Sequence, residues 1–116
     1  MVRRIETILP YPPSLNSYYR HVGFRVLISR EGRKYRKMVV SRLGGARPLE
    51  GRLSFTALLY PKDRRRRDVD NVLKSLLDSL AHAGTMHDDS QIKVLHVVMN
   101  EPDGEARVEV RMEELE

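Results

Sequence analysis

The segment Leu53–Tyr60 constrains the fold of this chain more than any other. Apolar side chains alternate along it with the two-residue period of a β-strand, at Leu53, Phe55, Ala57 and Leu59. Both faces become apolar towards the end of the segment, as expected for a strand with neighbours on both sides. We therefore expect Leu53–Tyr60 to be a central strand that Pro61 closes.

Two other segments have the apolar spacing of amphipathic helices. The first covers about Arg30–Leu43, with Ser29 as its N-cap and Gly44 at its end. The second starts at Asp70, which we expect at or near the N-cap, and ends before Gly84. Its apolar side chains recur at helical spacing, at Val72, Leu73, Leu76, Leu77 and Leu80.

Shorter apolar runs predict the remaining strands, which are Arg3–Leu9, Phe24–Ile28, Ile92–Met99 and Arg107–Met112. Three prolines make Pro10–His21 an ordered loop, and we expect the last two strands to form a hairpin. The predicted order is β-β-α-β-α-β-β. We therefore predict an α+β fold in which residues 1–116 form a single domain, with a mixed sheet and two main helices.

Composition narrows the class of protein. The chain has no cysteine, which excludes disulfides, zinc–thiolate sites and thiol nucleophiles. No apolar run approaches the roughly 20 residues that span a membrane, and the N-terminal segment lacks the pattern of a signal peptide. We therefore expect a cytoplasmic protein with no membrane partner.

Charge is distributed unevenly along the chain. Residues 1–67 contain 17 Lys and Arg and 4 Asp and Glu, whereas residues 68–116 contain 4 and 12. The change falls where the four arginines Arg64–Arg67 meet the Asp-x-Asp pair of Asp68 and Asp70. A basic segment of this size predicts a polyanionic partner, most simply nucleic acid, and a solvated basic surface is the plainer alternative.

The Asp-x-Asp pair predicts a metal site. Residues two apart in an extended chain point the same way, so the carboxylates of Asp68 and Asp70 can bind one cation. Hard oxygen ligands suit Mg²⁺ or Mn²⁺. Asp88 and Asp89 precede the next predicted strand, and they would bring a third carboxylate to the same place if that strand lies beside Leu53–Tyr60.

Two neighbouring residues can assist these carboxylates. Lys74 lies one helical turn after Asp70, where it can hold the ligand geometry or stabilise charge in the transition state. Asn71 can bond a ligand carboxylate or a metal-bound water. A cation, carboxylates and arginines together are what the hydrolysis of a nucleic-acid phosphodiester needs.

Each of these residues also has a structural interpretation. An Asp at a helix start is usually a cap, Asp70 and Lys74 can form a surface ion pair, and consecutive arginines are often a solvated loop. Tyr18–His21 can stack on bases or pack within the protein. We expect His82 to be structural and His87 not to be catalytic. The position of the four arginines directly before Asp68 and Asp70 favours the functional interpretation. A purely structural loop gains nothing from four cations next to two carboxylates.

Three segments resemble the RusA-type Holliday junction resolvases, a family of small homodimeric endonucleases. The segments are LPYPPSLNSYYRH, SREGRKYR and, most specifically, DRRRRDVDNVLKSLLDSLAHAGTMHDDSQI. The resemblance covers nearly the whole chain. It departs from the family pattern at Thr85-Met86-His87, where bulky aromatic or apolar residues are more usual.

The resemblance implies a concrete function. Members bind four-way DNA junctions and cut two opposing strands symmetrically, with Mg²⁺ or Mn²⁺, in DNA recombination and repair. By this likeness Asp68, Asp70 and Asp89 are the essential carboxylates, Lys74 is the essential lysine and Asp88 is a further candidate metal ligand. We expect DNA contacts from the arginine run and nearby motif positions, namely Arg64, Arg65, Arg66, Arg67, Asn71, Asn16, Tyr19 and Arg20.

Two alternatives belong to other functional classes. The chain can be a non-catalytic DNA-binding module, in which the acids are caps and the arginines contact the DNA backbone. It can also be a phosphatase-like hydrolase with Asp68 or Asp70 as nucleophile. The second alternative ranks lower, because that fold usually places its Asp-x-Asp directly after an apolar strand near the N-terminus.

Overall fold

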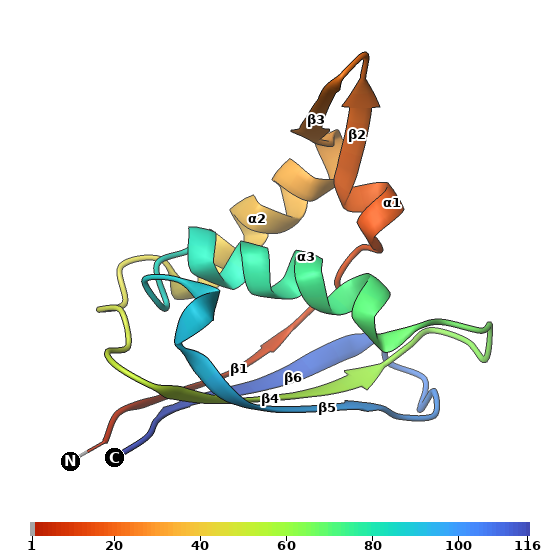
Figure 1. The fold of residues 1–116 in the computed structure, drawn as a ribbon. Coiled ribbons are helices and arrows are strands. Elements are labelled where there is room, and N and C mark those ends of the chain that lie inside the picture. Colours follow the sequence, from red (N-terminus) through yellow and green to blue (C-terminus); the bar gives the residue numbers. More distant parts are fainter. Residues whose placement is uncertain (1) are drawn as a thin grey trace.

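The computed structural model describes residues 2–116, which form a mixed four-stranded sheet covered on one face by helices (Figure 1). The strand order is β1-β6-β4-β5, and a separate two-stranded hairpin projects beyond the helices. The elements are β1 (Arg4–Leu9), α1 (Leu15–Tyr18), β2 (Tyr19–Val22), β3 (Arg25–Ile28), α2 (Arg30–Leu43), β4 (Leu53–Tyr60), α3 (Val69–His82), the 3₁₀ turn η1 (Asp89–Gln91), β5 (Ile92–Met99) and β6 (Arg107–Glu114).

β4 is the central strand of the sheet, as predicted. It pairs antiparallel with β6 on one side and parallel with β5 on the other. Its inward side chains are buried beneath the helices, at Leu53, Phe55, Ala57 and Leu59. The α+β fold class is confirmed, and the predicted element order holds once the short elements α1, β2 and η1, which the sequence did not predict, are set aside.

The two long helices bury their apolar faces against this sheet. α2 contributes Tyr35 and Val39, and α3 contributes Val72, Leu76 and Leu80. α2 has the bounds that the sequence predicts, and the Ser29 hydroxyl accepts the Gly32 amide at 3.0 Å as its N-cap. Within residues 2–116, no helix combines the length and the apolar character needed to cross a membrane.

Two predictions about strand neighbours and loops are wrong. β5 and β6 do not form a hairpin, because β6 inserts between β1 and β4 and pairs with both. The segment between β5 and β6 therefore passes the end of β4, where the Asn100 amide donates to the Leu59 carbonyl at 2.8 Å. Pro10–His21 is not a continuous loop, since it contains α1 and the start of β2.

The β4–α3–β5 unit fixes which end of the sheet each loop occupies. α3 leaves the C-terminal end of β4 and returns over the sheet, so β5 starts beside the start of β4, with Leu53 opposite Ile92. Just before β4, the Leu49 amide donates to the Thr85 carbonyl at 2.8 Å. The two ends of α3 therefore lie at opposite ends of the sheet, as Figure 1 shows.

Tyr18 joins α1, α2 and α3. Its side chain is buried, and its hydroxyl donates to the carboxylate of Asp78 on α3 and accepts from Arg36 Nε of α2 at 2.7 Å. Arg36 Nη2 also donates to Asp78, at 2.5 Å. Burial raises the pKa of Asp78, but the hydrogen bonds from Arg36 and Tyr18 outweigh it, so the pKa lies below its usual range.

We expect Asp78→Asn to lower the free energy of unfolding near neutral pH by about 1–2 kcal/mol, because Arg36 and the Tyr18 hydroxyl lose a charged acceptor. The folded-state pKa of Asp78 is lowered. Its contribution is therefore present above the unfolded pKa of about 3.9 and is lost as pH falls through the folded pKa.

Urea denaturation near neutral pH and near pH 3 measures this effect, and the difference between wild type and variant should shrink at the lower pH. Glu105→Gln, at an exposed turn residue, is the control. A difference of equal size at both pH values would contradict a role for the Asp78 charge.

Candidate nuclease site

The first acidic pair lies at the start of α3. Asp68 is the N-cap, with extended backbone (φ −96°, ψ 137°), and its carboxylate makes no capping hydrogen bond. Asp70 lies in the first helical turn, near the N-cap as expected, and both side chains are exposed. Neither carboxylate caps the start of α3 with a hydrogen bond, and both lie at the positive end of the helix dipole.

Lys74 and Asn71 flank this pair on the same helix. Lys74 is exposed, and in the described part of the chain it forms no ion pair with Asp70. Its charge instead helps to lower the pKa of Asp78. Asn71 is partly exposed, and its backbone amide donates to the backbone carbonyl of Asp68 at 3.2 Å. The alternative of an Asp70–Lys74 surface pair is therefore not realised.

The arginine run divides into one structural residue and three exposed ones. Arg67 folds back on its own loop, because its Nη1 donates to the carbonyls of Asp63 and Arg65 at 2.8 and 2.9 Å. Its Nη2 lies 2.8 Å from the Asp63 carboxylate, and its guanidinium lies over the Tyr11 ring. We expected all four arginines to bind DNA, but the Arg67 side chain is largely used in holding the loop.

The other three arginines face solvent. Arg64 pairs with Glu101 at 3.1 Å, although both side chains are about 80% exposed and such a pair is weak. Arg65 and Arg66 are exposed and form no ion pair within residues 2–116. A hollow beside the run is lined by this loop and by the end of β5, at Pro61, Asp63, Arg64, Arg65, Arg67, Met99, Asn100, Glu101 and Pro102.

In the second acidic pair, the Asp88 carboxylate has a structural role, and the Asp89 carboxylate has no partner within residues 2–116. Asp88 caps η1, because its carboxylate accepts the Ser90 amide at 3.0 Å while the Gln91 side chain accepts the Asp88 amide at 3.0 Å. The hydrogen bond to Ser90 lowers the pKa of Asp88. Asp89 is exposed at the start of η1. The Asp-x-x-Gln spacing of a capping box was the sequence signal for Asp88 that our sequence interpretation missed.

The two acidic pairs do not meet within one chain. β5 does lie beside β4, as the third-carboxylate expectation required, but it starts at the opposite end of β4 from Asp68 and Asp70. The helix between them has 14 residues and is therefore about 21 Å long. Figure 1 shows the start of α3 and the turn before β5 at opposite ends of the molecule. Among the described residues, no three His, Cys, Asp or Glu side chains are grouped to hold a metal.

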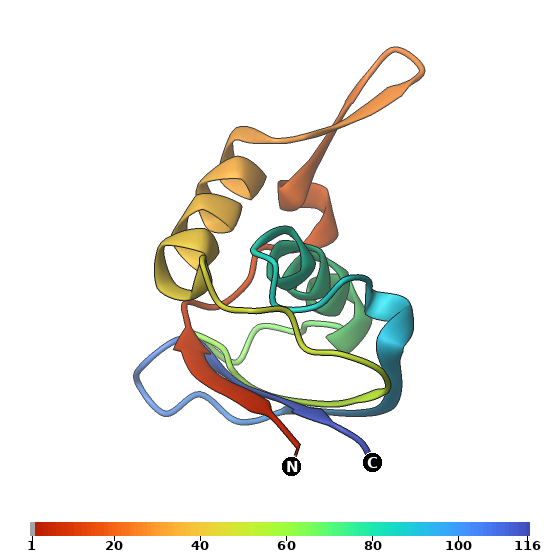
Figure 2. The same ribbon diagram turned by 90° about the vertical axis from the view of Figure 1, so that its left-hand side faces the viewer.

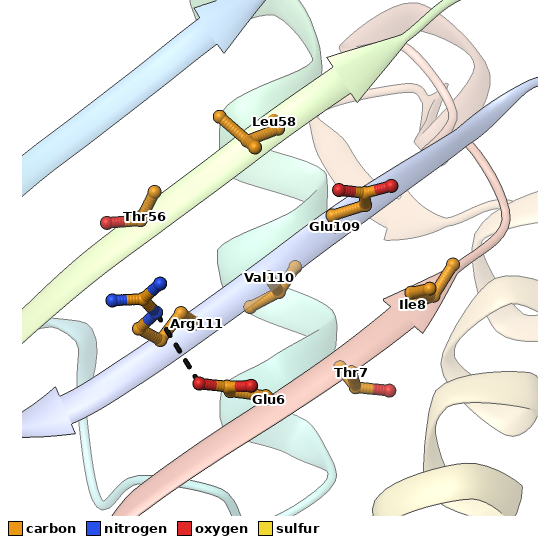
Figure 3. A pocket seen from close by; sticks show the side chains of 8 residues that line it. All are labelled: Glu6, Thr7, Ile8, Thr56, Leu58, Glu109, Val110 and Arg111. Atoms are coloured by element: carbon orange, nitrogen blue, oxygen red, sulfur yellow. Dashed lines mark ion pairs between the residues drawn. The ribbon is translucent and has the colours of Figure 1, made fainter.

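A separate hollow on the open face of the sheet does not offer a better site. Figure 3 shows its lining from β1, β4 and β6, at Glu6, Thr7, Ile8, Thr56, Leu58, Glu109, Val110 and Arg111. Its carboxylates already have cationic partners: Glu6 lies 3.6 Å from Arg111, and Glu109 lies 3.0 Å from Arg107. Both carboxylates of this hollow therefore lie beside arginine side chains, and its lining holds two carboxylates, with no third.

The N-terminal candidates for DNA contact are split between two environments. Tyr18 is buried in the helix layer, whereas Arg20 and His21 are exposed on β2, in the hairpin that Figure 2 shows rising from the helices. Tyr19 is partly buried, with its ring nearly perpendicular to the Tyr18 ring at a centroid distance of 4.8 Å, and Asn16 is exposed on α1. The packing interpretation therefore holds for Tyr18, whereas a DNA contact from the exposed Arg20 and His21 stays a prediction.

His87 lies beside the acidic pair but has a partner elsewhere. Its Nε2 lies 2.9 Å from the Glu50 carboxylate, and both side chains are exposed. This contact joins the turn before η1 to the turn before β4 and does not involve Asp88 or Asp89.

Comparisons with known proteins show the family of this chain. A model of the family described as Endodeoxyribonuclease RusA matches residues 10–113. The chain is 41% identical over 114 residues to the crossover junction endodeoxyribonuclease of Enterobacteria phage HK97, and the match covers 96% of this chain and 95% of that protein. Identities of 38% relate it to the proteins of the same name from Shigella sonnei and Enterobacteria phage 82, with 92% of both chains covered in each case.

The family match includes both acidic pairs, the arginine run and Lys74, because all of them lie between residues 10 and 113. The coverage agrees with the extent of the resemblance read from the three sequence segments. This chain belongs to the RusA family of endodeoxyribonucleases.

Proposed function

We propose that this chain is a metal-dependent endonuclease that resolves four-way DNA junctions by paired, symmetric incisions, in DNA recombination and repair. The observation that carries the proposal is a pair of exposed carboxylates, Asp68 and Asp70, that form no helix-capping hydrogen bond. They follow the exposed cations of Arg65 and Arg66 in the chain. The names of the relatives supply the substrate class, a crossover junction. Since that substrate would be bacterial or phage DNA, we place the activity in the cytoplasm.

The donor set suits a hard divalent cation. One or two carboxylates, with waters and a substrate phosphate, are the usual ligands of Mg²⁺ in proteins, and Mn²⁺ can replace it. Such a cation supplies a water of lowered pKa and stabilises the leaving oxygen. Lys74 would stabilise the negative oxygens of the scissile phosphate, and Asn71 would orient a ligand carboxylate. Arg65 and Arg66 would hold the flanking phosphates.

We further infer that the third carboxylate comes from a second protomer. Asp89 lies about one helix length, roughly 20 Å, from Asp70 in the same chain, whereas oxygen ligands lie about 2.1 Å from Mg²⁺. In a two-fold dimer, a contact between η1 of one protomer and the start of α3 in the other occurs twice. The dimer would then carry two sites, as two opposing strands of a junction require.

The exposed edge of β5 suits such a dimer. β5 is an edge strand with two half-exposed apolar side chains, Val94 (49%) and Leu95 (51%). An unpaired strand edge is a template for another strand. Antiparallel pairing of two β5 strands about a two-fold axis would direct η1 of each protomer towards the end of the partner's sheet where α3 starts.

The non-catalytic DNA-binding module remains the second candidate. It is favoured by one observation, the separation of Asp89 from Asp68 and Asp70 within a single chain. The two candidates differ in the expected effect of Asp70→Asn. The binding module would keep its full function, whereas the nuclease would lose cleavage.

Asp70→Asn should reduce metal-dependent cleavage of synthetic four-way junctions by about a thousandfold or more, and junction binding should remain, because the change removes a metal ligand and not a phosphate contact. Asp89→Asn should act in the same way. Asp88→Asn should retain cleavage, since the Asp88 carboxylate caps η1.

Cleavage is measured on junction, duplex and flap DNA with and without Mg²⁺ or Mn²⁺. A wild type that binds junctions but never nicks them would support the binding module.

Mixing the two inactive variants tests whether the site is shared between protomers. An Asp70→Asn protomer paired with an Asp89→Asn protomer keeps one intact site if the carboxylates combine across the dimer, and none if each site lies within one chain. Random exchange should therefore restore about one quarter of the sites, seen as single nicks in place of paired cuts. Sedimentation checks that both variants are dimers at micromolar concentration. A monomer, or a mixture with no activity, would contradict the shared site.

Arg65 and Arg66 should bind DNA, whereas Arg67 should stabilise its loop. Replacing Arg65 and Arg66 together with Ala should weaken junction binding and reduce the slope of log K against log salt by about 2, because two phosphate contacts release fewer counterions. Arg67→Ala should mainly lower thermal stability. Binding isotherms between low and moderate salt, with melting curves for each variant, separate the two roles. An unchanged salt slope would assign Arg65 and Arg66 to a solvated loop.

A further inference from the structure

The β2–β3 hairpin carries an apolar tip that the proposed metal site does not use. The hairpin is a two-stranded sheet of its own, and both views show it projecting from the helix layer (Figures 1 and 2). Phe24 at the turn is fully exposed (108%), and Val22 and Val26 beside it are about half exposed. An aromatic ring that is wholly exposed at the end of a projecting hairpin is available to a binding partner.

The base of the hairpin is fixed firmly to the helices. The Ser29 amide after β3 donates to the Tyr18 carbonyl before β2 at 2.8 Å, and Arg33 Nη1 donates to the Ile28 carbonyl at 2.8 Å. Gly32 lies so close to this base that a side chain there would collide with the Tyr18 carbonyl oxygen. The arm is therefore anchored where it starts, and its tip is displaced from the helices by about 13 Å, the length of a four-residue strand.

The hairpin combines an apolar ring at its tip with cations along its strands. Gly23, with φ of +61°, makes the turn, the exposed Arg25 follows Phe24 and pairs with Val22, and the exposed Arg20 pairs with Leu27 nearer the base. A second copy of this tip would bring like charges together, which opposes self-association. Nucleic acid fits better, because it presents flat apolar bases inside an anionic backbone.

The same helix supports the hairpin base and the acidic pair. Asp78, which binds the Tyr18 hydroxyl, lies eight residues after Asp70 on α3, a distance of about 12 Å along the helix axis. DNA held at the acidic pair would therefore extend beside the arm. Phosphate contacts alone carry no information about branching, so selection of a branch needs a contact to bases.

We propose that Phe24 is a wedge that stacks on unpaired or unstacked bases at the branch point of junction DNA, with Arg20 and Arg25 holding the adjacent phosphates. This proposal rests on the proposed function for its substrate. A ring that gains a stacking partner only where the duplex is open favours branched over linear DNA.

The chain contains no tryptophan, so Phe24→Trp introduces a single tryptophan at the tip, which can be excited selectively over the five tyrosines. With metal removed by a chelator, so that no cleavage occurs, its emission should be quenched on four-way junctions and unchanged on linear duplex of the same sequence. Val26→Trp, on a flanking strand of the same hairpin, is the matched control and should respond much less.

Phe24→Ala should weaken junction binding by about tenfold to a hundredfold, the effect of losing a stacked base, and leave duplex binding unchanged. Phe24→Tyr should restore the preference. Because Phe24 is fully exposed, circular dichroism should show all variants folded.

The wedge would be overturned if Phe24→Ala bound junctions as tightly as wild type does. It would also be overturned if the fluorescence of Phe24→Trp were quenched equally, or not at all, by junction and duplex DNA. Conversion of a dimer to a monomer by Phe24→Ala would also overturn it, in favour of a self-association contact. Because these measurements need no cleavage, a wild type that never cuts junctions would remove the nuclease proposal and leave this one standing on the binding data.

Discussion

The parallel pairing of β4 with β5 is the constraint on which the rest of the molecule depends. A parallel pair needs a crossover connection, and here that connection is α3, which buries Val72, Leu76 and Leu80 against the sheet. The loop leaving β4 and the turn entering β5 are consequently held at opposite ends of the sheet. Asp68 and Asp70, which follow the arginine run in the sequence, therefore lie at one end of the sheet, and Asp89 lies at the other. This separation is the reason for proposing a site shared between two protomers.

The charged residues near these loops fall into two groups that their order in the sequence does not reveal. Arg67, Asp78 and Asp88 are engaged by hydrogen bonds that hold a loop, the helix layer and η1 respectively. Asp68, Asp70, Asp89, Arg65 and Arg66 are exposed, and their side chains form no hydrogen bond or ion pair of this kind within residues 2–116. Adjacent residues of the same type therefore have different roles, and the exposed group has the charges that a cation and a phosphate backbone require.

The bond network around Tyr18 gives these parts a common support. It ties α1, α2 and α3 together through Arg36 and Asp78, and the β2–β3 hairpin starts directly after it. The acidic pair and the hairpin are thus attached to one helix and are held in a fixed relation. This is the kind of scaffold that a structure-specific nuclease needs, because contacts to a cut site and to a branch must be made at a set spacing.

The sequence by itself determined the elements and the candidate residues. Alternating apolar residues predicted β4 as central, helical spacing and Ser29 located α2, and the arginine run next to Asp68 and Asp70 gave the candidate site, because periodicity, capping and charge are local properties. The tertiary structure decided the neighbours. It separated β5 from β6, buried Tyr18, and placed Asp89 at the far end of α3. These outcomes follow from which strand edges pair and in which direction, and no local pattern encodes that choice.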